Sequence, residues 1–336
     1  MHLGILTSVV LSLAALSVIL TAWYYPRHKD LPAKSPRRSP SRDFYDGAYD
    51  NQPVAATDND DYVSLARAHA RRIGIPEAIK TFIENYGLTA ANALEVGCGS
   101  GLLQGFTDRY VGIDLSLSVR RFFHQPFVQA SAVELPFSDS TFDAAWSIWV
   151  LEHITNPEQA LSEIRRVVKD GGYVLLRPAW DVDAWASQGY EVRPYSDFGW
   201  KGKLIKASIP VRSSRWYKMF YVRPVRVMRT LCTVLSGKPS QLRYRRLEPN
   251  YLRFWVTDSD AAVALDFYEV LLWFTTRGDE CVNCPRRSEL LFGGPGGRLD
   301  TMIFRLNKPN DAARRVSGRS HSALAAIARG LETGPA

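Results

Sequence analysis

Residues 93–101 read Ala-Leu-Glu-Val-Gly-Cys-Gly-Ser-Gly, and this stretch decides the expected fold. A short apolar run containing Glu95 passes directly into three glycines at the alternate positions 97, 99 and 101. A buried strand that enters so tight a turn brings its backbone close to a bound ligand, where side chains would be in the way. The stretch therefore predicts a strand, a turn and a ligand site.

A second acid stands where a nucleoside site needs one. Asp114 follows the apolar run 110–113 and comes 19 residues after Glu95. In doubly wound α/β domains, an acid at the end of the second strand binds the hydroxyls of a ribose. We therefore expect the glycine turn and Asp114 to bind a nucleoside-containing cofactor.

Strand and helix patterns alternate through the rest of this region. Such alternation predicts parallel strands joined by right-handed crossovers. The expected fold class is α/β: a Rossmann-like doubly wound sheet of seven strands, mostly parallel with the last strand antiparallel, and with an insertion after strand five. The expected strands are 91–96, 110–113, 126–129, 141–149, 173–177, 289–292 and 302–306, with a helix at 258–277 before the sixth.

Six motifs resemble those of class I S-adenosylmethionine-dependent methyltransferases, in the small-molecule branch called type 11, which includes the quinone-biosynthesis methyltransferases. The motifs stand in the family's order, and the resemblance covers about residues 65–177. They are 94–101, 111–116, 135–137, 142–143, 150–154 and 169–175. The resemblance implies that the cofactor is S-adenosyl-L-methionine.

The resemblance also implies how that cofactor is held. Glu95 would hold the methionine ammonium, Asp114 would accept both ribose hydroxyls, and Leu115 would pack on the adenine. The backbone would approach the methionine part of the cofactor along the turn, at Gly97, Cys98, Gly99 and Gly101.

The chain departs from the family at the adenine end of the site. The family usually has an Asp where this chain has Ser131, so Ser131 or the backbone at Ala132 is expected to bind the adenine amino group instead. Ser147, near the carboxyl end of the fourth strand, is also expected at the cofactor. No metal site is expected.

The main alternative is a dinucleotide site. Its fingerprint is G-x-G-x-x-G, whereas residues 97–101 read G-x-G-x-G behind a carboxylate. A carboxylate would repel a pyrophosphate but can bind the ammonium of a sulfonium amino acid. The spacing therefore favours a methyl donor.

His153, just after the fourth strand, is the candidate catalytic base. A hydroxyl acceptor needs to lose a proton on methylation, and imidazole titrates near neutral pH. The alternative, that His153 only caps a helix or lines the pocket, is equally open.

The amino end has the composition of a membrane span. Residues 3–25 carry no charge, and about 20 apolar residues suffice to cross a bilayer. Basic residues follow this run and none precedes it, so the positive-inside rule places the catalytic domain in the cytoplasm. We expect a single-pass membrane anchor at 1–25 and a flexible linker at 26–61. A cleaved signal peptide is the alternative.

The insertion, residues 179–257, is rich in aromatic and basic side chains. Insertions at this place in type 11 enzymes commonly cover the acceptor, so we expect a lid or a face against the membrane. The alternatives are a plain structural subdomain and a groove for single-stranded nucleic acid. Because no nucleic-acid module accompanies it, no nucleic-acid partner is expected. The oligomeric state is unknown from the sequence.

Composition sets outer limits. A chain of 336 residues with 46% apolar residues can bury a substantial core, which excludes global disorder. The net charge of +8 does not indicate sequence-specific nucleic-acid binding. Cys281 and Cys284 form a lone C-x-x-C without a second pair of ligands, so they are expected to be ordinary thiols rather than a zinc or redox pair.

These expectations define one methyltransferase domain at 62–310, followed by a basic tail at 311–336. The expected function is transfer of a methyl group from S-adenosyl-L-methionine to a small or lipophilic acceptor, membrane-associated acceptors included. The alternative is a catalytically silent, cofactor-binding scaffold at a membrane. The intact glycine turn with both acids favours the enzyme.

Overall fold

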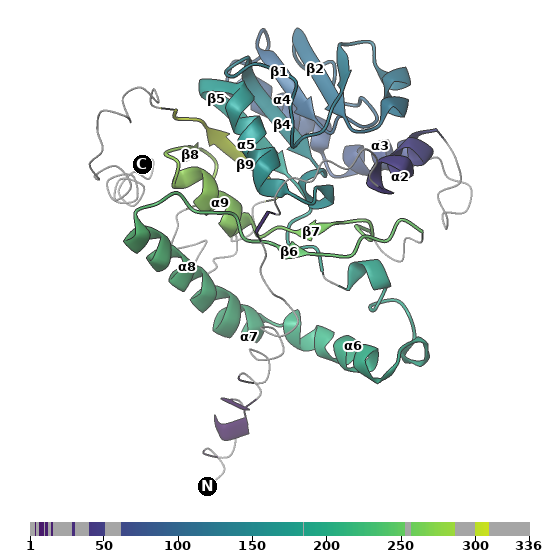
Figure 1. Cartoon of the computed structure of the whole chain (residues 1–336), viewed down its shortest axis with the longest axis vertical. Helices are drawn as coiled ribbons and strands as arrows, with labels where there is room; N and C mark the ends of the chain where they lie inside the picture. The colour runs from purple at the N-terminus through teal and green to yellow at the C-terminus, as the bar shows by residue number, and fades with distance from the viewer. Residues whose placement is uncertain are drawn as a thin grey trace.

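One mixed sheet of seven strands organises the protein (Figure 1). The structure, a computed structural model, describes residues 40–50, 62–183, 185–252, 257–285 and 300–308, with positions 29–30 and, nearer the amino end, 4, 7–9, 11–12 and 15. The strand order is β3-β2-β1-β4-β5-β9-β8. Successive strands extend to one side of the sheet from β1 and to the other side from β4. Ligands of open α/β sheets bind at the carboxyl edge where this change of side occurs.

The first five strands are parallel. They are β1 (Asn92–Val96), β2 (Arg109–Asp114), β3 (Phe127–Gln129), β4 (Phe142–Ile148) and β5 (Val168–Arg177). β9 (Met302–Arg305) runs antiparallel to β5, and β8 (Glu280–Cys281) runs antiparallel to β9. The predicted fold class is therefore confirmed.

Helices cover both faces of this sheet. α3 (Tyr62–Arg72) and α4 (Ile75–Asn85) contribute to the core cluster on one face. α5 (Pro157–Val167) and α9 (Phe267–Thr275) contribute to the cluster on the other. Adjacent residues of β4 enter opposite clusters, Ala145 with α5 and Trp146 with α4, because side chains alternate along a strand.

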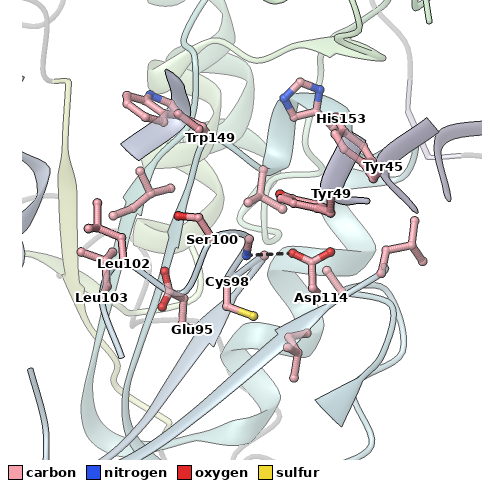
Figure 2. Close-up of a pocket in the computed structure, with 18 of the residues that line it drawn as sticks. Tyr45, Tyr49, Glu95, Cys98, Ser100, Leu102, Leu103, Asp114, Trp149 and His153 are labelled. Atoms are coloured by element: carbon pink, nitrogen blue, oxygen red, sulfur yellow. Dashed lines mark hydrogen bonds between the residues drawn. The ribbon is translucent and has the colours of Figure 1, made fainter. Parts of the chain in front are cut away.

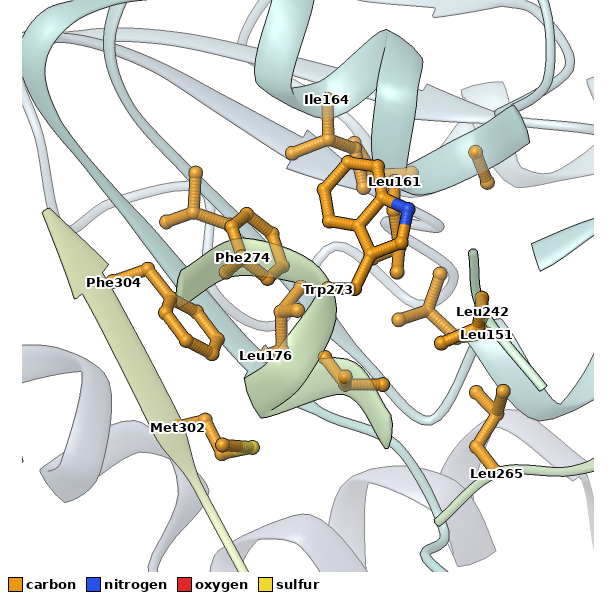
Figure 3. Close-up of a cluster of buried hydrophobic side chains, with 14 of the residues drawn as sticks. Leu151, Leu161, Ile164, Leu176, Leu242, Leu265, Trp273, Phe274, Met302 and Phe304 are labelled. Atoms are coloured by element: carbon orange, nitrogen blue, oxygen red, sulfur yellow. The ribbon is translucent and has the colours of Figure 1, made fainter. Parts of the chain in front are cut away.

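α9 is buried along its length (Figure 3). Phe274 stacks on Phe304 of β9, with ring centroids 4.0 Å apart. The helix begins nine residues later than the sequence predicts, because Asp266 caps it by accepting a hydrogen bond from the Tyr268 amide at 2.9 Å. The preceding residues from 257 form turns and β7 (Val263–Ala264) instead.

The insertion between β5 and α9 is mainly helical. Its helices are η3 (Ala186–Gln188), η4 (Tyr195–Asp197), α6 (Trp200–Arg212), α7 (Arg215–Tyr217), the π-helix η5 (Lys218–Val222) and α8 (Arg223–Ser236). In Figure 1, α6, α7 and α8 follow one another along one side of the molecule, with β6 (Arg245–Arg246) and β7 between them and the main sheet. The Ala262 amide donates to the Glu152 carbonyl at 2.8 Å, so the insertion reaches η2 (Leu151–His153) after β4.

Part of the stretch expected to be a linker is helical. α2 (Pro40–Tyr49) lies against η1 (Leu117–Phe122), just after β2. The Ser118 hydroxyl donates to Asp50 at 2.9 Å, and the Ser116 hydroxyl donates to Asp46. These bonds bring α2 to the carboxyl edge of the sheet.

The predicted membrane anchor is contradicted. Among the described residues, no helix combines the length and the apolar content needed to cross a membrane. Most of residues 3–25 lie outside the described residues, and the positions described there form runs of at most three, whereas a span needs about 20 residues in one helix. The prediction of a single-pass anchor that leaves the catalytic domain in the cytoplasm is therefore wrong.

Two other expectations fall outside the described residues, the strand at 289–292 and the tail at 311–336. At the sheet edge, β8 lies beside β9 at residues outside every strand that the sequence predicted.

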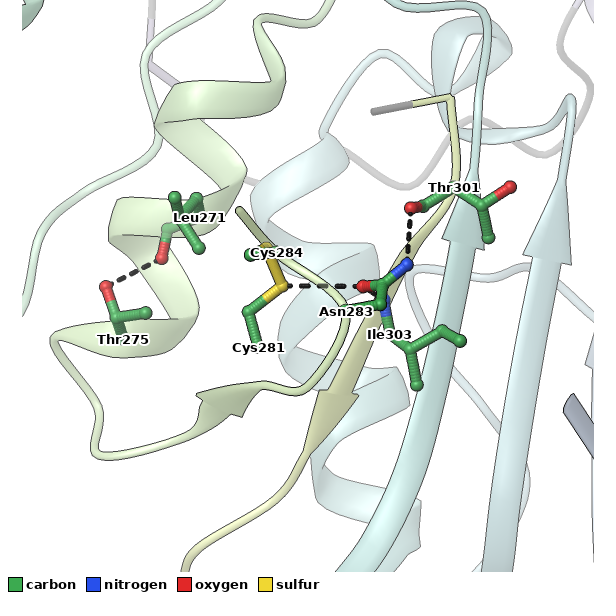
Figure 4. Close-up of a disulfide and its surroundings, with 7 residues drawn as sticks. All are labelled: Leu271, Thr275, Cys281, Asn283, Cys284, Thr301 and Ile303. Atoms are coloured by element: carbon green, nitrogen blue, oxygen red, sulfur yellow. Dashed lines mark hydrogen bonds between the residues drawn. A yellow bond between two sulfur atoms is a disulfide. The ribbon is translucent and has the colours of Figure 1, made fainter. Parts of the chain in front are cut away.

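Cys281 and Cys284 form a disulfide, where ordinary thiols were expected (Figure 4). Asn283, between them, accepts a hydrogen bond from the Ile303 amide at 2.8 Å and donates to the Thr301 carbonyl at 2.9 Å. The disulfide loop is thus joined to β9.

Candidate functional site

A cavity of about 230 Å³ opens at the carboxyl edge of β1, β2 and β4 (Figure 2). The glycine turn after β1 lines it, as do residues that follow β2, β3 and β4. α2 and α3 contribute side chains from the opposite side. Residues predicted for the cofactor and residues not predicted at all therefore meet in one space.

The glycine turn is shaped by close contacts. Gly97 has φ 75°, and a Cβ placed there would lie 2.1 Å from Cγ2 of Val150. Gly99 has φ 44°, and a Cβ there would lie 2.9 Å from the Tyr49 hydroxyl. Only glycine satisfies both the left-handed backbone and the lack of space.

Glu95 is a buried carboxyl group at the floor of the cavity. It is 5% exposed and accepts a hydrogen bond from the Tyr110 hydroxyl. Burial raises the pKa of Glu95 to about 8, although the bond from Tyr110 acts in the opposite direction. A cationic ligand group beside it would favour the ionised form, so this position suits an ammonium.

Asp114 faces Glu95 across the turn. Its Oδ2 accepts a hydrogen bond from the Gly99 amide at 3.0 Å, and its Oδ1 accepts one from the Ser116 amide at 3.0 Å (Figure 2). Burial raises the pKa of Asp114 to about 6, against the effect of these amides. Each oxygen retains acceptor capacity, so the carboxylate can accept from two neighbouring hydroxyls of a ribose.

Most of the predicted cofactor residues line the cavity. Those that do are Glu95, Gly97, Cys98, Gly99, Asp114, Leu115, Ser131 and Ala132, together with the candidate base His153. Gly101 and Ser147 are not among the lining residues; Ser147 is buried, and its hydroxyl has no partner within the described part of the chain. The Ser131 hydroxyl accepts from the Val133 amide at 3.4 Å, within its own turn.

His153 lies beside a carboxylate that the sequence did not point out. Its Nδ1 is 3.3 Å from Oδ2 of Asp260, and the same oxygen accepts a hydrogen bond from the Tyr45 hydroxyl at 2.7 Å. Burial lowers the pKa of His153, but the carboxylates of Asp260, Glu152 and Asp258 raise it more, so the net shift is upward. The His153 side chain is 18% exposed and keeps access to the cavity.

Glu152 supports this cluster from behind. It is fully buried, and its Oε1 accepts from the Ala179 amide at 3.0 Å and lies 3.9 Å from Nε2 of His153. Burial raises the pKa of Glu152 to about 7. Glu152 therefore places a second carboxyl group near the imidazole, but it does not line the cavity itself.

Three tyrosines of the amino-terminal helices also line the cavity, Tyr45 and Tyr49 from α2 and Tyr62 from α3. Figure 2 shows Tyr49 between Asp114 on one side and Tyr45 with His153 on the other. Burial raises the pKa of each of these tyrosines, so they remain protonated donors. Sequence reasoning missed them because two stand in the stretch taken for a linker; the one signal was their aromatic spacing.

Comparison with known proteins gives the family context. Residues 94–176 match a family model described as a methyltransferase domain. The fatty-acid O-methyltransferase of Mycolicibacterium smegmatis is 33% identical over 141 residues, which cover 34% of this chain and 52% of that protein. The ubiquinone/menaquinone biosynthesis C-methyltransferase of Hahella chejuensis is 36% identical over 80 residues, which cover 24% of this chain and 32% of that protein.

Among solved structures, a SAM-bound amino pentose methyltransferase from Micromonospora echinaspora matches with 19% identity and a TM-score of 0.31, covering 35% of this chain and 57% of that one. So low a score supports no argument about function. The chain spans about half the length of the first curated relatives that it matches. The predicted resemblance and the predicted cofactor, S-adenosyl-L-methionine, are confirmed.

Proposed function

Because this chain carries a methyltransferase domain at residues 94–176, we propose that it transfers the methyl group of S-adenosyl-L-methionine to a small, lipophilic acceptor. One observation carries the proposal: Glu95, Asp114 and His153 line the same cavity. Such a transfer can use one carboxylate to bind the methionine ammonium, a second to bind the ribose hydroxyls, and a base to accept the proton of the acceptor. Glu95, Asp114 and His153 are proposed for these three roles, in that order.

The residues present fit the cofactor. The buried carboxyl group of Glu95 suits the methionine ammonium, and Asp114 suits the ribose hydroxyls. Leu115, Ser131 and Ala132 line the same cavity, which supports the proposal that they contact the adenine. When bound, the cofactor would supply a methyl group carried by a sulfonium. Loss of that methyl group converts the sulfonium into a neutral thioether, which makes it a good leaving group.

His153 is the proposed base for a hydroxyl acceptor. Nδ1–H donates a hydrogen bond to the Asp260 carbonyl at 3.4 Å and lies 3.3 Å from the Asp260 carboxylate, which leaves Nε2 unprotonated in the neutral ring. With a hydroxyl acceptor, Nε2 would take up the proton that the acceptor oxygen loses on methylation. The Asp260 carboxylate would stabilise the charged imidazole, and the hydrogen bond from Tyr45 holds that carboxylate in place.

The acceptor is proposed to be lipophilic because its end of the cavity is mainly apolar. Trp149, Val150 and Ile154 line the cavity together with His153. The names of two relatives, a fatty-acid O-methyltransferase and a quinone C-methyltransferase, describe proteins with lipophilic acceptors, which supports the same class here.

Two measurements test the proposal. Calorimetry on the full chain should detect binding of S-adenosyl-L-methionine, and cofactor with a labelled methyl group should label a component of a lipid extract. His153→Gln should keep the binding and lose most of the transfer. Absence of binding by the unmutated chain would refute the proposal, whereas binding without transfer to any extract would favour a silent scaffold.

A further inference from the structure

The helices of the insertion carry charge of one sign. Residues 200–238 contain ten Lys or Arg and no Asp or Glu. The whole chain has 42 basic and 34 acidic residues, so the remaining 297 residues carry 32 basic against 34 acidic, a net −2. The basic excess of the protein therefore lies in this one segment.

α8 turns its polar face toward the protein. Arg226 forms an ion pair with Asp266 at 2.8 Å, and Arg229 forms one with Glu269 at 3.1 Å, both at α9. The side chains of Arg229 and Glu269 are only 12% and 1% exposed. Removing one partner of so buried a pair would leave an uncompensated charge, so these pairs fix the rotation of α8.

As a result, the apolar face of α8 lies in solvent. Met228, Leu231 and Leu235, spaced by three and four residues, are 61%, 50% and 85% exposed. An amphipathic helix of a soluble protein normally has the reverse orientation, with its apolar stripe toward the core.

α6 has apolar residues on two opposite faces. Ile205 and Ile209 pack on the buried cluster that contains Trp185. Trp200, Leu204 and Val211, which share the other face, are 70%, 63% and 51% exposed, and the exposed Lys201 and Lys203 flank them. An apolar stripe edged by lysines is typical of a helix at a lipid surface, where the charged ends reach the headgroups.

α7 and η5, which lie between these two helices in the sequence, continue the same surface. Trp216 and Phe220 are 67% and 49% exposed and stack with ring centroids 5.9 Å apart. Figure 1 shows that α6, α7 and α8 follow one another along one side of the molecule. We name as the docking face its eight exposed apolar residues: Trp200, Leu204, Val211, Trp216, Phe220, Met228, Leu231 and Leu235.

We propose that the docking face seats the protein on the surface of an anionic lipid bilayer. Its aromatic and aliphatic side chains would enter the boundary between headgroups and acyl chains, and the surrounding lysines and arginines would attract anionic headgroups. The helices would lie on the surface rather than span the bilayer. This inference does not depend on the proposed function, since it requires neither cofactor nor acceptor.

Charge selects a lipid surface over a second copy of the chain. Two copies joined through the docking face would bring together two segments that each carry no acidic residue and eight basic residues besides Arg226 and Arg229, which are paired with acids at α9. The positive charges of the two copies would repel one another, whereas anionic headgroups would neutralise them.

Cys232 offers a reporter on the docking face. It is an exposed free thiol on α8, next to Leu231, while Cys98 is buried and the other two cysteines form the disulfide. A thiol-reactive, environment-sensitive fluorophore on the full chain should therefore label Cys232. With vesicles that contain phosphatidylglycerol, its emission should shift to the blue and be quenched by a lipid-borne quencher; with phosphatidylcholine alone it should not change.

The same dye at a position outside the docking face tests whether the dye itself, rather than the docking face, inserts into the bilayer. The variant Leu65→Cys/Cys232→Ser carries the dye on α3, at a position that is 42% exposed, and should show no shift. Trp200→Ser/Leu235→Ser should weaken vesicle binding roughly tenfold relative to Leu65→Ser, since all these side chains are exposed and their loss leaves folding intact.

Three results would overturn the proposal. One is an unchanged Cys232 dye in the presence of anionic vesicles, even if the protein sediments with them through another segment. The second is an equal shift of both dyes. The third is a blue shift without vesicles that grows with protein concentration, which would assign the face to a second copy.

Discussion

The two ends of the cavity are held in place by different kinds of contact. At the end proposed for the cofactor, called the cofactor end, the backbone amide of Gly99 donates to Asp114, 15 residues away in sequence. At the end proposed for the acceptor, called the acceptor end, His153 contacts Asp260, 107 residues away, and Asp260 accepts from Tyr45, 215 residues away. One end rests on adjacent strands, and the other rests on side chains from three distant segments.

The backbone contacts at the cofactor end are general to strands and turns of this shape, whereas the side-chain contacts at the acceptor end are particular to this chain. Backbone amides are present in any strand and turn of this shape, so the contacts that hold Asp114 in place at the glycine turn come from the matched region 94–176. Asp260 and Tyr45 lie outside that region. Substitutions at the first end should therefore affect folding and cofactor binding, and substitutions at the second should affect transfer alone.

The largest expected effect is on folding at the cofactor end. Gly97→Ala should lower the free energy of unfolding by about 3 kcal/mol, because its Cβ meets Val150 in a left-handed backbone. Gly87→Ala is the matched control, since Gly87 has φ 64° but nothing within 4 Å of its Cβ. It should cost only about 1 kcal/mol. Urea denaturation measures both, and equal losses would contradict the packing argument.

The next effect is on cofactor affinity. Asp114→Ala removes the acceptor for two hydroxyls and should weaken binding of S-adenosyl-L-methionine roughly a hundredfold, about 3 kcal/mol. Asp108→Ala, at an exposed position just before β2, serves as the control and should bind normally. Calorimetry decides, and an unchanged dissociation constant for Asp114→Ala would remove Asp114 from the site.

At the acceptor end, Asp260→Asn should lower transfer on the order of 30-fold, because the imidazole loses its orienting carboxylate. Cofactor affinity should stay within about twofold, as Asp260 lies at the other end. Asp260 raises the pKa of His153, so its loss lowers that pKa and moves the acid limb of the rate profile to lower pH. A limb that stays in place would show that His153 is not the titrating base.

The smallest effect is a pH dependence of cofactor binding. Glu95, with a pKa of about 8, is mostly protonated at neutral pH, and an ammonium beside it favours ionisation. Binding should therefore release a proton, and affinity should rise by up to about tenfold per pH unit between about pH 6.5 and 8. Calorimetry in buffers of different ionisation enthalpy measures this release. Glu95→Gln should abolish it, and proton uptake by the unmutated chain would contradict the assignment.

The cofactor end could be predicted from sequence because its groups are local. Glu95 and Asp114 each stand at the end of a strand, and parallel strands bring their carboxyl ends to one edge. Ser147 also follows that logic, yet it points into the core rather than the cavity. Position along a strand predicts the edge, but not the face on which a side chain emerges when both faces are buried.

The acceptor end could not be predicted for a different reason. Asp258 and Asp260 resemble helix-capping residues, but Asp266 takes that role and frees Asp260 to contact His153. Likewise, the helical spacing of α8 identifies two faces without saying which one turns inward. Its rotation depends on Asp266 and Glu269, whose partners become evident only when α8 and α9 are packed together.

α2 joins the two ends of the cavity. Tyr49 places its hydroxyl over Gly99, and Tyr45, four residues earlier, holds Asp260. Any outward movement of α2 that widens the passage over the glycine turn also withdraws Tyr45 from the acid behind His153. If His153 is the proposed base, then access to the glycine turn and the orientation of that base would both depend on the position of this one short helix.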